Sequence, residues 1–172
     1  MCSSDLSGGL LLHRIPQRPD ALDRAGRDVL GVEARDGGLD VEEVIAFAKK
    51  EMRTPSKSWK GLCQSFCRSA YGVPAWAPSA ITAWGKIPRG QKHSGGKPSD
   101  APRGALLYYA IGKYGHVTIA AGKKTHTTCF SNDYVETGKI DRAPRSMERW
   151  GARYLGWSNW TPYGELRVGK QP

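Results

Sequence analysis

Apolar positions after residue 39 first follow the period of a helix. Asp40 can cap the free backbone amides of a helix start, and Glu43 three residues later completes a capping box. From there the apolar residues recur at helical spacing: Val41, Val44, Ile45, Ala48 and Met52. Pro55 interrupts this period, so the pattern predicts one helix that ends just before it.

A second helical pattern occupies the segment Ser58–Gly72, which reads SWKGLCQSFCRSAYG. Its apolar residues fall on one helical face: Trp59, Leu62, Cys63, Phe66, Cys67, Ala70 and Tyr71. Gly72 can end a helix, and Pro74 prevents continuation. We therefore expect a helix with Cys63 near its start, followed by a short helical turn at 78–85.

Strand patterns come after the helices. The basic stretch 88–102 is rich in Gly, Pro and Ser, and it is expected to be irregular. Apolar and β-branched runs bounded by glycines then predict strands at 104–112, 116–122, 124–130, 154–158 and 165–168. Helices followed by short antiparallel hairpins indicate the α+β fold class.

Charge adds a candidate partner to this picture. The 172 residues include 26 Lys and Arg against 16 Asp and Glu, which gives a net charge of +10. Such a protein is attracted to polyanions: nucleic acid, an anionic membrane, or a bacterial wall rich in teichoic acid. No sequence signature of an RNA- or DNA-binding module is present, so no nucleic-acid partner is expected. A non-catalytic basic module that binds the wall or nucleic acid remains the alternative to an enzyme.

The first 38 residues differ in composition from the rest. Arg, Asp, Gly and Leu dominate them without a sustained apolar period, and residues 2–6 resemble the translation of a common sequencing adapter. We expect 1–38 to be a disordered or artefactual leader and 39–172 to form a single catalytic domain. The start of the chain lacks the basic region and cleavage site of a signal peptide, and no apolar run reaches the roughly 20 residues of a membrane span.

Cys63 raises a choice between core packing and chemistry. The amides and dipole at a helix start stabilise a thiolate, and a nearby imidazole can hold its proton. His116 is the first residue of a predicted strand, directly after a glycine, and His126 on the next strand is its rival. Cys67 is expected to pack in the core as a small apolar residue. Cys63 and Cys67 share a helical face but lack a second pair of ligands, so neither a metal nor another cofactor is expected.

Four segments together resemble the papain-like peptidoglycan hydrolases of the CHAP and NlpC types, especially endolysins of actinobacterial phages. The segments are WKGLCQSFCRSAYG, DAPRGALLYYAIGKYGHVTIAAG, SNDYVETGKID and RWGARYLGWS. The resemblance implies a papain-like fold in which Cys63 is the nucleophile and His116 the general base of amide hydrolysis. It also implies a monomer made in the cytoplasm that acts at the cell wall, with holin-type release if a phage encodes it.

The same resemblance implies a third polar residue, on the strand after the histidine, that orients the imidazole ring. Asp133 is the first choice, with Asn132 and His126 as alternatives. If Gly122 and Lys123 form a two-residue turn, Cys129 lies opposite His116, and the odd positions 127, 131 and 133 share its face.

Two further features bear on the site. The families place Gln or Asp before the nucleophile, whereas this chain has Leu62 there and Gln64 after it. An oxyanion hole would therefore use the amide of Cys63 and a second donor. A cluster of aromatic residues near the C-terminus can form either a stacking surface for substrate or part of the core: Trp150, Tyr154, Trp157, Trp160 and Tyr163.

Overall fold

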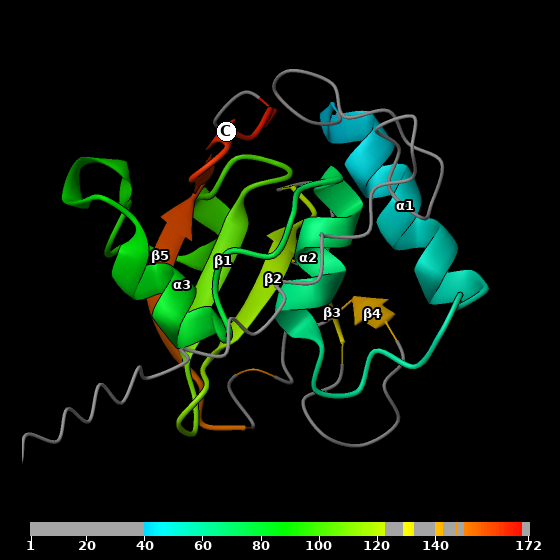
Figure 1. Cartoon of the computed structure of the whole chain (residues 1–172), viewed down its shortest axis with the longest axis horizontal. Helices are drawn as coiled ribbons and strands as arrows, with labels where there is room; N and C mark the ends of the chain where they lie inside the picture. The colour runs from blue at the N-terminus through cyan, green and yellow to red at the C-terminus, as the bar shows by residue number, and fades with distance from the viewer. Residues whose placement is uncertain (1–39, 123–128, 133–139, 143–146, 148–149, 170–172) are drawn as a thin grey trace, which may run out of the picture.

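The structure is a computed structural model that describes residues 40–122, 129–132, 140–142, 147 and 150–169. The expected leader, 1–38, lies outside the described residues, and so does the question of where the domain starts. Three α-helices precede a five-stranded antiparallel sheet along the chain (Figure 1). The predicted α+β class is confirmed.

The first helix, α1 (Val41–Arg53), begins as the sequence predicts. The Asp40 carboxylate accepts hydrogen bonds from the amides of Glu42 and Glu43, and the Glu43 carboxylate accepts one from the Asp40 amide. This capping box satisfies amides that a helix start otherwise leaves without partners. The helix turns its apolar face, which includes Val44, towards the sheet.

The second helix, α2 (Cys63–Tyr71), starts one turn later than its apolar period predicts. Gly61 has a positive φ of 68°, which interrupts the helical path before Cys63. Trp59 is nonetheless buried, because its ring packs at 5.4 Å against Phe66 of the helix. Trp59 is therefore buried from a turn rather than from a helix, Leu62 is exposed at 40 %, and Cys63 becomes the first helical residue.

A short third helix, α3 (Ala80–Lys86), confirms the helical turn expected near 78–85. Ser79 caps it through a hydrogen bond from the Thr82 amide. The basic loop that follows contains only two single 3-10 turns, η1 (Arg89–Gln91) and η2 (Pro98–Asp100).

The large sheet has the strand order β4-β3-β2-β1-β5. Its strands are β1 (Leu106–Ala110), β2 (His116–Ala120), β3 (Cys129–Asn132), β4 (Ile140–Arg142) and β5 (Arg153–Ser158). A separate hairpin is formed by β6 (Trp160–Thr161) and β7 (Gly164–Glu165). The strands expected at 104–112 and 116–122 are confirmed with shorter bounds, and the strand expected at 154–158 is confirmed with a start one residue earlier, at Arg153. The strand expected at 124–130 can be compared only at 129–130, which belong to β3, because 124–128 lie outside the described residues. The strand expected at 165–168 coincides with β7 only at 165, and β4 was not predicted.

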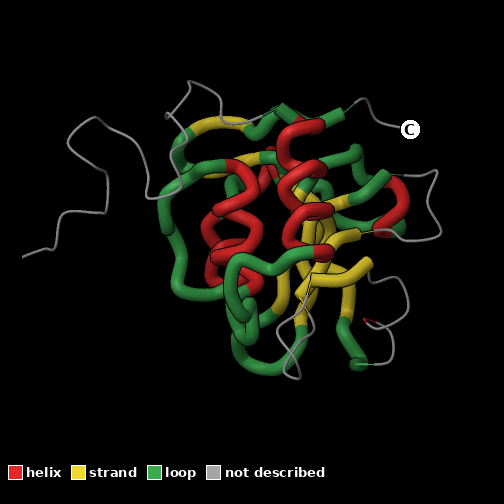
Figure 2. The backbone as a smooth tube through the Cα atoms, turned by 90° about the vertical axis from the view of Figure 1, so that its right-hand side faces the viewer, coloured by secondary structure: helices red, strands yellow, loops and turns green. Residues whose placement is uncertain are grey.

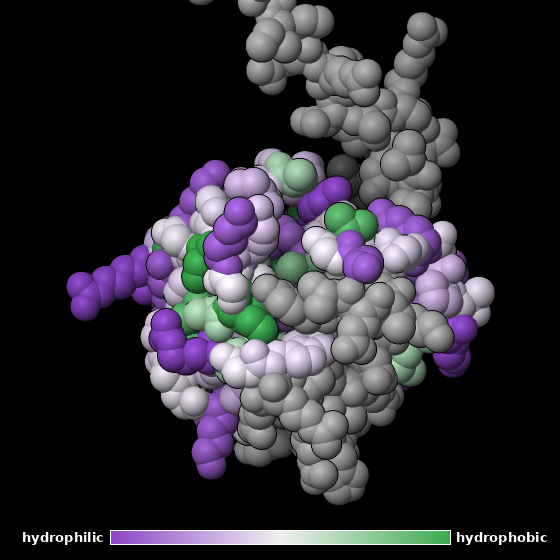
Figure 3. All heavy atoms as spheres, turned by 90° about the horizontal axis from the view of Figure 1, so that it is seen from below, coloured by the Kyte–Doolittle hydropathy of each residue, from purple (hydrophilic) through white to green (hydrophobic). Residues whose placement is uncertain are grey.

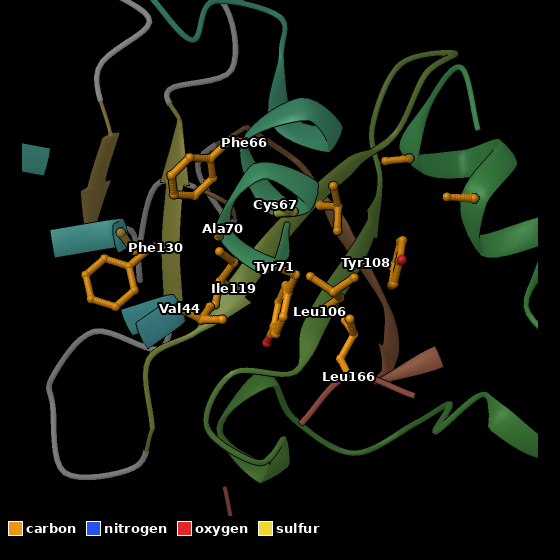
Figure 4. Packing of buried hydrophobic residues seen from close by; sticks show 14 of the residues in the cluster. Val44, Phe66, Cys67, Ala70, Tyr71, Leu106, Tyr108, Ile119, Phe130 and Leu166 are labelled. Atoms are coloured by element: carbon orange, nitrogen blue, oxygen red, sulfur yellow. The ribbon is translucent and has the colours of Figure 1, made fainter. Parts of the chain in front are cut away.

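Both faces of the sheet are covered. The helices pack on one face, where α2 directs Phe66, Cys67 and Ala70 towards the strands (Figures 2 and 4). A second cluster on the other face includes Leu107 and Trp157. Burial on both faces explains why β1 reads as a continuous apolar run instead of alternating.

The register between β2 and β3 corrects one expectation. Cys129 pairs with Ala120 and Phe130 with Ile119, so Cys129 does not lie opposite His116. The assumed two-residue turn at Gly122 is therefore wrong, since residues 121–128 connect the paired positions. The shift is an even number of residues, which leaves the odd positions of β3 on the face of His116.

The basic loop is attached to β5 by close backbone contact. The amide and carbonyl groups of His93 pair with those of Trp157, and the two rings stack with centroids 3.6 Å apart. Gly156 makes this approach possible: a Cβ atom there would lie 2.4 Å from the His93 carbonyl oxygen. Any side chain at residue 156 would push the loop away.

A buried carboxylate anchors the segment that leads to Cys63. Glu51 is 2 % exposed, and its Oε2 accepts hydrogen bonds from the Ser56 amide, the Ser56 hydroxyl and the Trp59 indole. Replacing Glu51 with alanine removes all three acceptor contacts and leaves the buried indole N–H without its partner. We expect Glu51→Ala to lower the free energy of unfolding by about 3 kcal/mol.

Urea denaturation of the purified protein measures this effect. Lys50→Ala, at an exposed position on the same helix, is the matched control and should change the free energy of unfolding by no more than about 0.5 kcal/mol. Equal unfolding midpoints for Glu51→Ala and Lys50→Ala would contradict the anchoring role.

Candidate active site

Cys63 is the half-buried first residue of α2 and lines a cleft, whereas Cys67 is 2 % exposed and belongs to the core. The predicted positions of the two cysteines are confirmed: Cys67 packs in the core, and Cys63 lies at the helix start. Leu62 precedes the helix as its N-cap and provides no side-chain hydrogen bond. The first amides of α2 are consequently left to interact with the sulfur or with a ligand.

The environment of the Cys63 thiol has two opposing effects on its acidity. Burial raises the pKa above the ordinary value, and this is the largest contribution. Hydrogen bonds from the backbone amides of Val117, Gln64 and Cys63 itself act in the opposite direction. The helix start therefore favours the thiolate as expected, but burial outweighs it, and the resting group is a neutral thiol.

The Val117 contact also fixes where the sulfur lies. Val117 is the second residue of β2, directly after His116, so the thiol sits at the amino end of that strand. Both α2 and β2 begin at the lower end of the molecule in Figure 1. The backbone starts of the cysteine helix and the histidine strand therefore meet. The imidazole of His116 points to the opposite face of the sheet, does not line the cleft, and makes no described contact with the thiol.

His116 is almost fully enclosed at 1 % exposure. The preceding Gly115 has a φ of 66°, and a Cβ atom there would lie 3.0 Å from the backbone nitrogen of Ile81. The glycine therefore lets the hairpin before His116 approach α3 closely. Burial lowers the pKa of His116 from 6.5 to about 4, so the imidazole is neutral at pH 7, and the same burial makes it a weaker proton acceptor than an exposed imidazole.

The imidazole of His116 has two described neighbours on the sheet face away from the helices. Its Nε2 lies 2.7 Å from the Ser131 hydroxyl oxygen, within hydrogen-bond distance. The Trp150 ring meets it edge-on, with centroids 6.2 Å apart. A buried ring held in this way has a fixed orientation, as a catalytic base requires.

Ser131, rather than a residue named from the sequence, is therefore the described partner on the strand after the histidine. Asp133 and His126 lie outside the described residues. Asn132 ends β3, where its backbone pairs with Ile140. The signal for Ser131 was available, because strand alternation placed 131 on the face of His116, but a search for a charged partner passed over a hydroxyl.

The Ser131 contact yields a prediction about orientation. Ser131→Ala should lower kcat by about ten- to a hundredfold with little change in KM, because the ring loses its fixed tautomer and orientation. The ¹⁵N chemical shifts of the imidazole should change in the same variant. Ser158→Ala, which removes a buried hydroxyl bonded to the Gln91 carbonyl, controls for lost stability alone. Wild-type kcat in Ser131→Ala would exclude the positioning role.

The cleft beside Cys63 has a volume of about 400 Å³. Three segments line it: the start of α2 with the turn before it, residues 77–80 ahead of α3, and residues 114–115 of the β1–β2 hairpin. Seen from below, the coloured surface mixes polar and apolar residues (Figure 3). A mixed cleft that ends at a thiol suits a polar substrate such as a peptide.

The C-terminal aromatic residues serve mainly in packing. Trp150 contacts His116, Trp157 stacks on His93, and Trp160 meets Trp76 edge-on at 5.8 Å. Tyr163 differs, since 54 % of its surface is exposed. The expectation that these residues could form a stacking surface therefore applies at most to Tyr163.

The described part of the chain offers neither a metal site nor a membrane-spanning helix. Among those residues, no group of three His, Cys, Asp or Glu side chains is arranged to hold a metal ion. None of the described helices combines the length and apolar character needed to cross a membrane. Comparison with family models, curated proteins and solved structures finds no match to this chain.

Proposed function

We propose that this protein is a papain-like cysteine hydrolase of the CHAP and NlpC type that cleaves an amide bond in bacterial peptidoglycan. One observation carries the proposal: the half-buried Cys63 thiol lies in a cleft at an uncapped helix start, with its sulfur against the amide that follows His116. A nucleophile, a base and backbone amide donors are the parts that acyl transfer needs. The choice of peptidoglycan as the substrate is based on the four sequence segments that resemble the CHAP and NlpC families.

The reaction starts from a neutral thiol and a neutral imidazole. As the sulfur attacks the substrate carbonyl carbon, a C–S bond forms. The proposal requires the thiol proton to reach His116, whose imidazole lies on the sheet face opposite the helix that bears Cys63. Ser131 holds Nε2 at 2.7 Å, and the proposal assigns the proton exchange to the other ring nitrogen, Nδ1. The amides of Cys63 and Gln64 donate to the resulting oxyanion.

Collapse of this intermediate breaks the C–N bond, and the amine departs with the proton from the imidazolium. Water then loses a proton to His116 and attacks the thioester, which releases the carboxylic acid and restores the thiol. Because the resting thiol is neutral, proton transfer accompanies attack instead of preceding it.

Digestion of purified peptidoglycan tests the proposal. Mass spectrometry of the soluble products should detect new amino and carboxyl ends without new reducing sugar ends. A free lactyl carboxyl on the glycan indicates an amidase, and cleavage inside the stem or cross-bridge indicates an endopeptidase. Intact walls, or products with only new reducing ends, would exclude amide hydrolysis.

The net charge of +10 supports a role for the wall polymers as an electrostatic anchor. Raising the salt to 0.3 M shortens the Debye length to about 6 Å. Activity on intact walls should then fall severalfold, while cleavage of a small neutral stem peptide should change little. Arg89→Glu with Lys97→Glu, at two exposed positions of the basic loop, should lower wall activity at low salt only.

The alternative hypothesis, a basic module that binds nucleic acid, predicts a different experimental result. Salt-dependent retardation of nucleic acid by the protein, together with an equal salt response of both hydrolysis substrates, would favour it. An equal salt response by itself would show that the basic surface is not a wall anchor.

A further inference from the structure

Arg68 occupies an unusual position for a surface arginine. It lies in the last turn of α2, is half-buried, and lines the same cleft as Cys63. One of its guanidinium nitrogens, Nη2, donates to the Ser65 hydroxyl at 3.3 Å. Among the described residues no carboxylate lies within ion-pair distance of it, and the one described ion pair joins Arg103 to Glu42.

A partly enclosed guanidinium without an acidic partner is costly unless a ligand provides one. Arginine offers a planar set of donors that matches a carboxylate, and most of these donors are not used by Ser65. A favourable interaction with the helix dipole would explain a basic residue in the last turns of α2, but not its placement in the cleft. The geometry indicates a binding role.

Gln64 supplies a second polar group in the same cleft. Its side-chain oxygen, Oε1, is buried and has no hydrogen-bond partner in the structure. A buried amide oxygen without a donor is unfavourable, and a substrate N–H that enters the cleft would satisfy it. Donors on Arg68 and an acceptor on Gln64 therefore line the same cleft as the nucleophile.

We propose that Arg68 binds a free carboxylate of the substrate while Gln64 Oε1 accepts a hydrogen bond from a neighbouring amide N–H. The backbone rise between Cys63 and Arg68 is about 7.5 Å along the helix, which corresponds to about two residues of extended peptide. The cleft consequently selects peptides that carry a carboxylate within about two residues of the scissile bond. This specificity rests on the proposed hydrolase function.

Binding to the Cys63→Ala protein tests the carboxylate site without turnover. The probes are two stem peptides that differ only in their glutamyl α-carboxyl group, which is free in one and amidated in the other. Isothermal titration should show that the free acid binds about tenfold or more tightly than the amide. Arg68→Gln in the same background should abolish the difference, and Arg68→Lys should restore part of it.

Lys60→Gln is the matched control, because it removes one positive charge from an exposed residue close to the cleft but outside its lining. It should keep the preference for the acid. Equal affinity for the two peptides, no binding of either, or a preference that persists in Arg68→Gln would each overturn the proposal.

Turnover by the wild-type enzyme separates this inference from the proposed function. Both hold if the free acid is hydrolysed with a KM about tenfold or more below that of the amide. Cys63-dependent hydrolysis with equal KM values would keep the function and overturn the carboxylate site. Binding that depends on Arg68, without any hydrolysis, would keep the carboxylate site and overturn the function.

Discussion

Replacing Cys63 with alanine should abolish hydrolysis of peptidoglycan, a loss of at least about a thousandfold in kcat/KM. The substitution removes the only atom in the proposed mechanism that bonds to the substrate carbon. Cys63 is half-buried at the edge of a cleft, so the free energy of unfolding should change by less than about 1 kcal/mol. Release of soluble wall fragments and urea denaturation measure the two quantities on the same preparation.

Cys67→Ala is the matched control on the same helix. Cys67 is 2 % exposed and packed in the core, so its truncation opens a small cavity and should cost about 1 kcal/mol of stability. Its hydrolytic activity should remain near that of the wild type. Full activity in Cys63→Ala, or loss of activity only in Cys67→Ala, would refute the assignment of the nucleophile.

His116→Gln should reduce kcat/KM by about 10²- to 10⁴-fold, because the thiol loses the base that accepts its proton. Burial lowers the pKa of His116 to about 4, so the base is already neutral well below pH 7. The kcat/KM of the wild type should therefore stay level down to about pH 5 and fall near pH 4 as the ring becomes protonated. An acid limb centred near pH 6.5 would contradict a buried base.

The same pKa shift predicts how stability depends on pH. The folded-state pKa of about 4 lies below the ordinary value of 6.5, so acidification protonates the unfolded chain first. The contribution of His116 to stability is fully present above pH 6.5 and is lost as the pH falls towards 4. Its size is about 3 kcal/mol at most.

Comparison of two proteins isolates this contribution from that of the carboxylates. The free energy of unfolding of the wild type, minus that of His116→Gln, should decrease between pH 6.5 and pH 4 and be constant above that range. A difference that is independent of pH would show that His116 titrates normally in the folded protein.

The sequence predicted the parts of the fold that local chemistry determines. The capping box of Asp40 and Glu43 fixed the start of α1, and the glycine-bounded apolar runs located β1, β2 and β5. Residues 59–62 misled the helix prediction, because a buried tryptophan in a turn has the same apolar period as one in a helix. The three residues of β4 are too few to produce a recognisable alternation.

Two residues of the candidate site, Cys63 and His116, could be predicted because each lies at the start of a helix or strand. A cysteine near a helix start and a histidine at a strand start are both visible in sequence, and the structure brings these two ends together. The register of β3 depends on the connection 121–128, which no local pattern determines, so the partner of the imidazole could not be fixed beforehand. Arg68 was missed because its lack of an acidic partner is a property of the folded cleft.

The claim that Cys63 is the nucleophile is tested most directly by trapping the acyl-enzyme. Wild-type protein is mixed with a stem peptide substrate, quenched in acid during turnover and digested with trypsin. Both cysteines of α2 fall in one peptide, GLCQSFCR, so tandem mass spectrometry must locate the added mass. We expect the acyl group as a thioester on Cys63 in the wild type and in Cys67→Ala. Hydrolysis without any adduct on Cys63 under these conditions, or an adduct on a different residue, would contradict it.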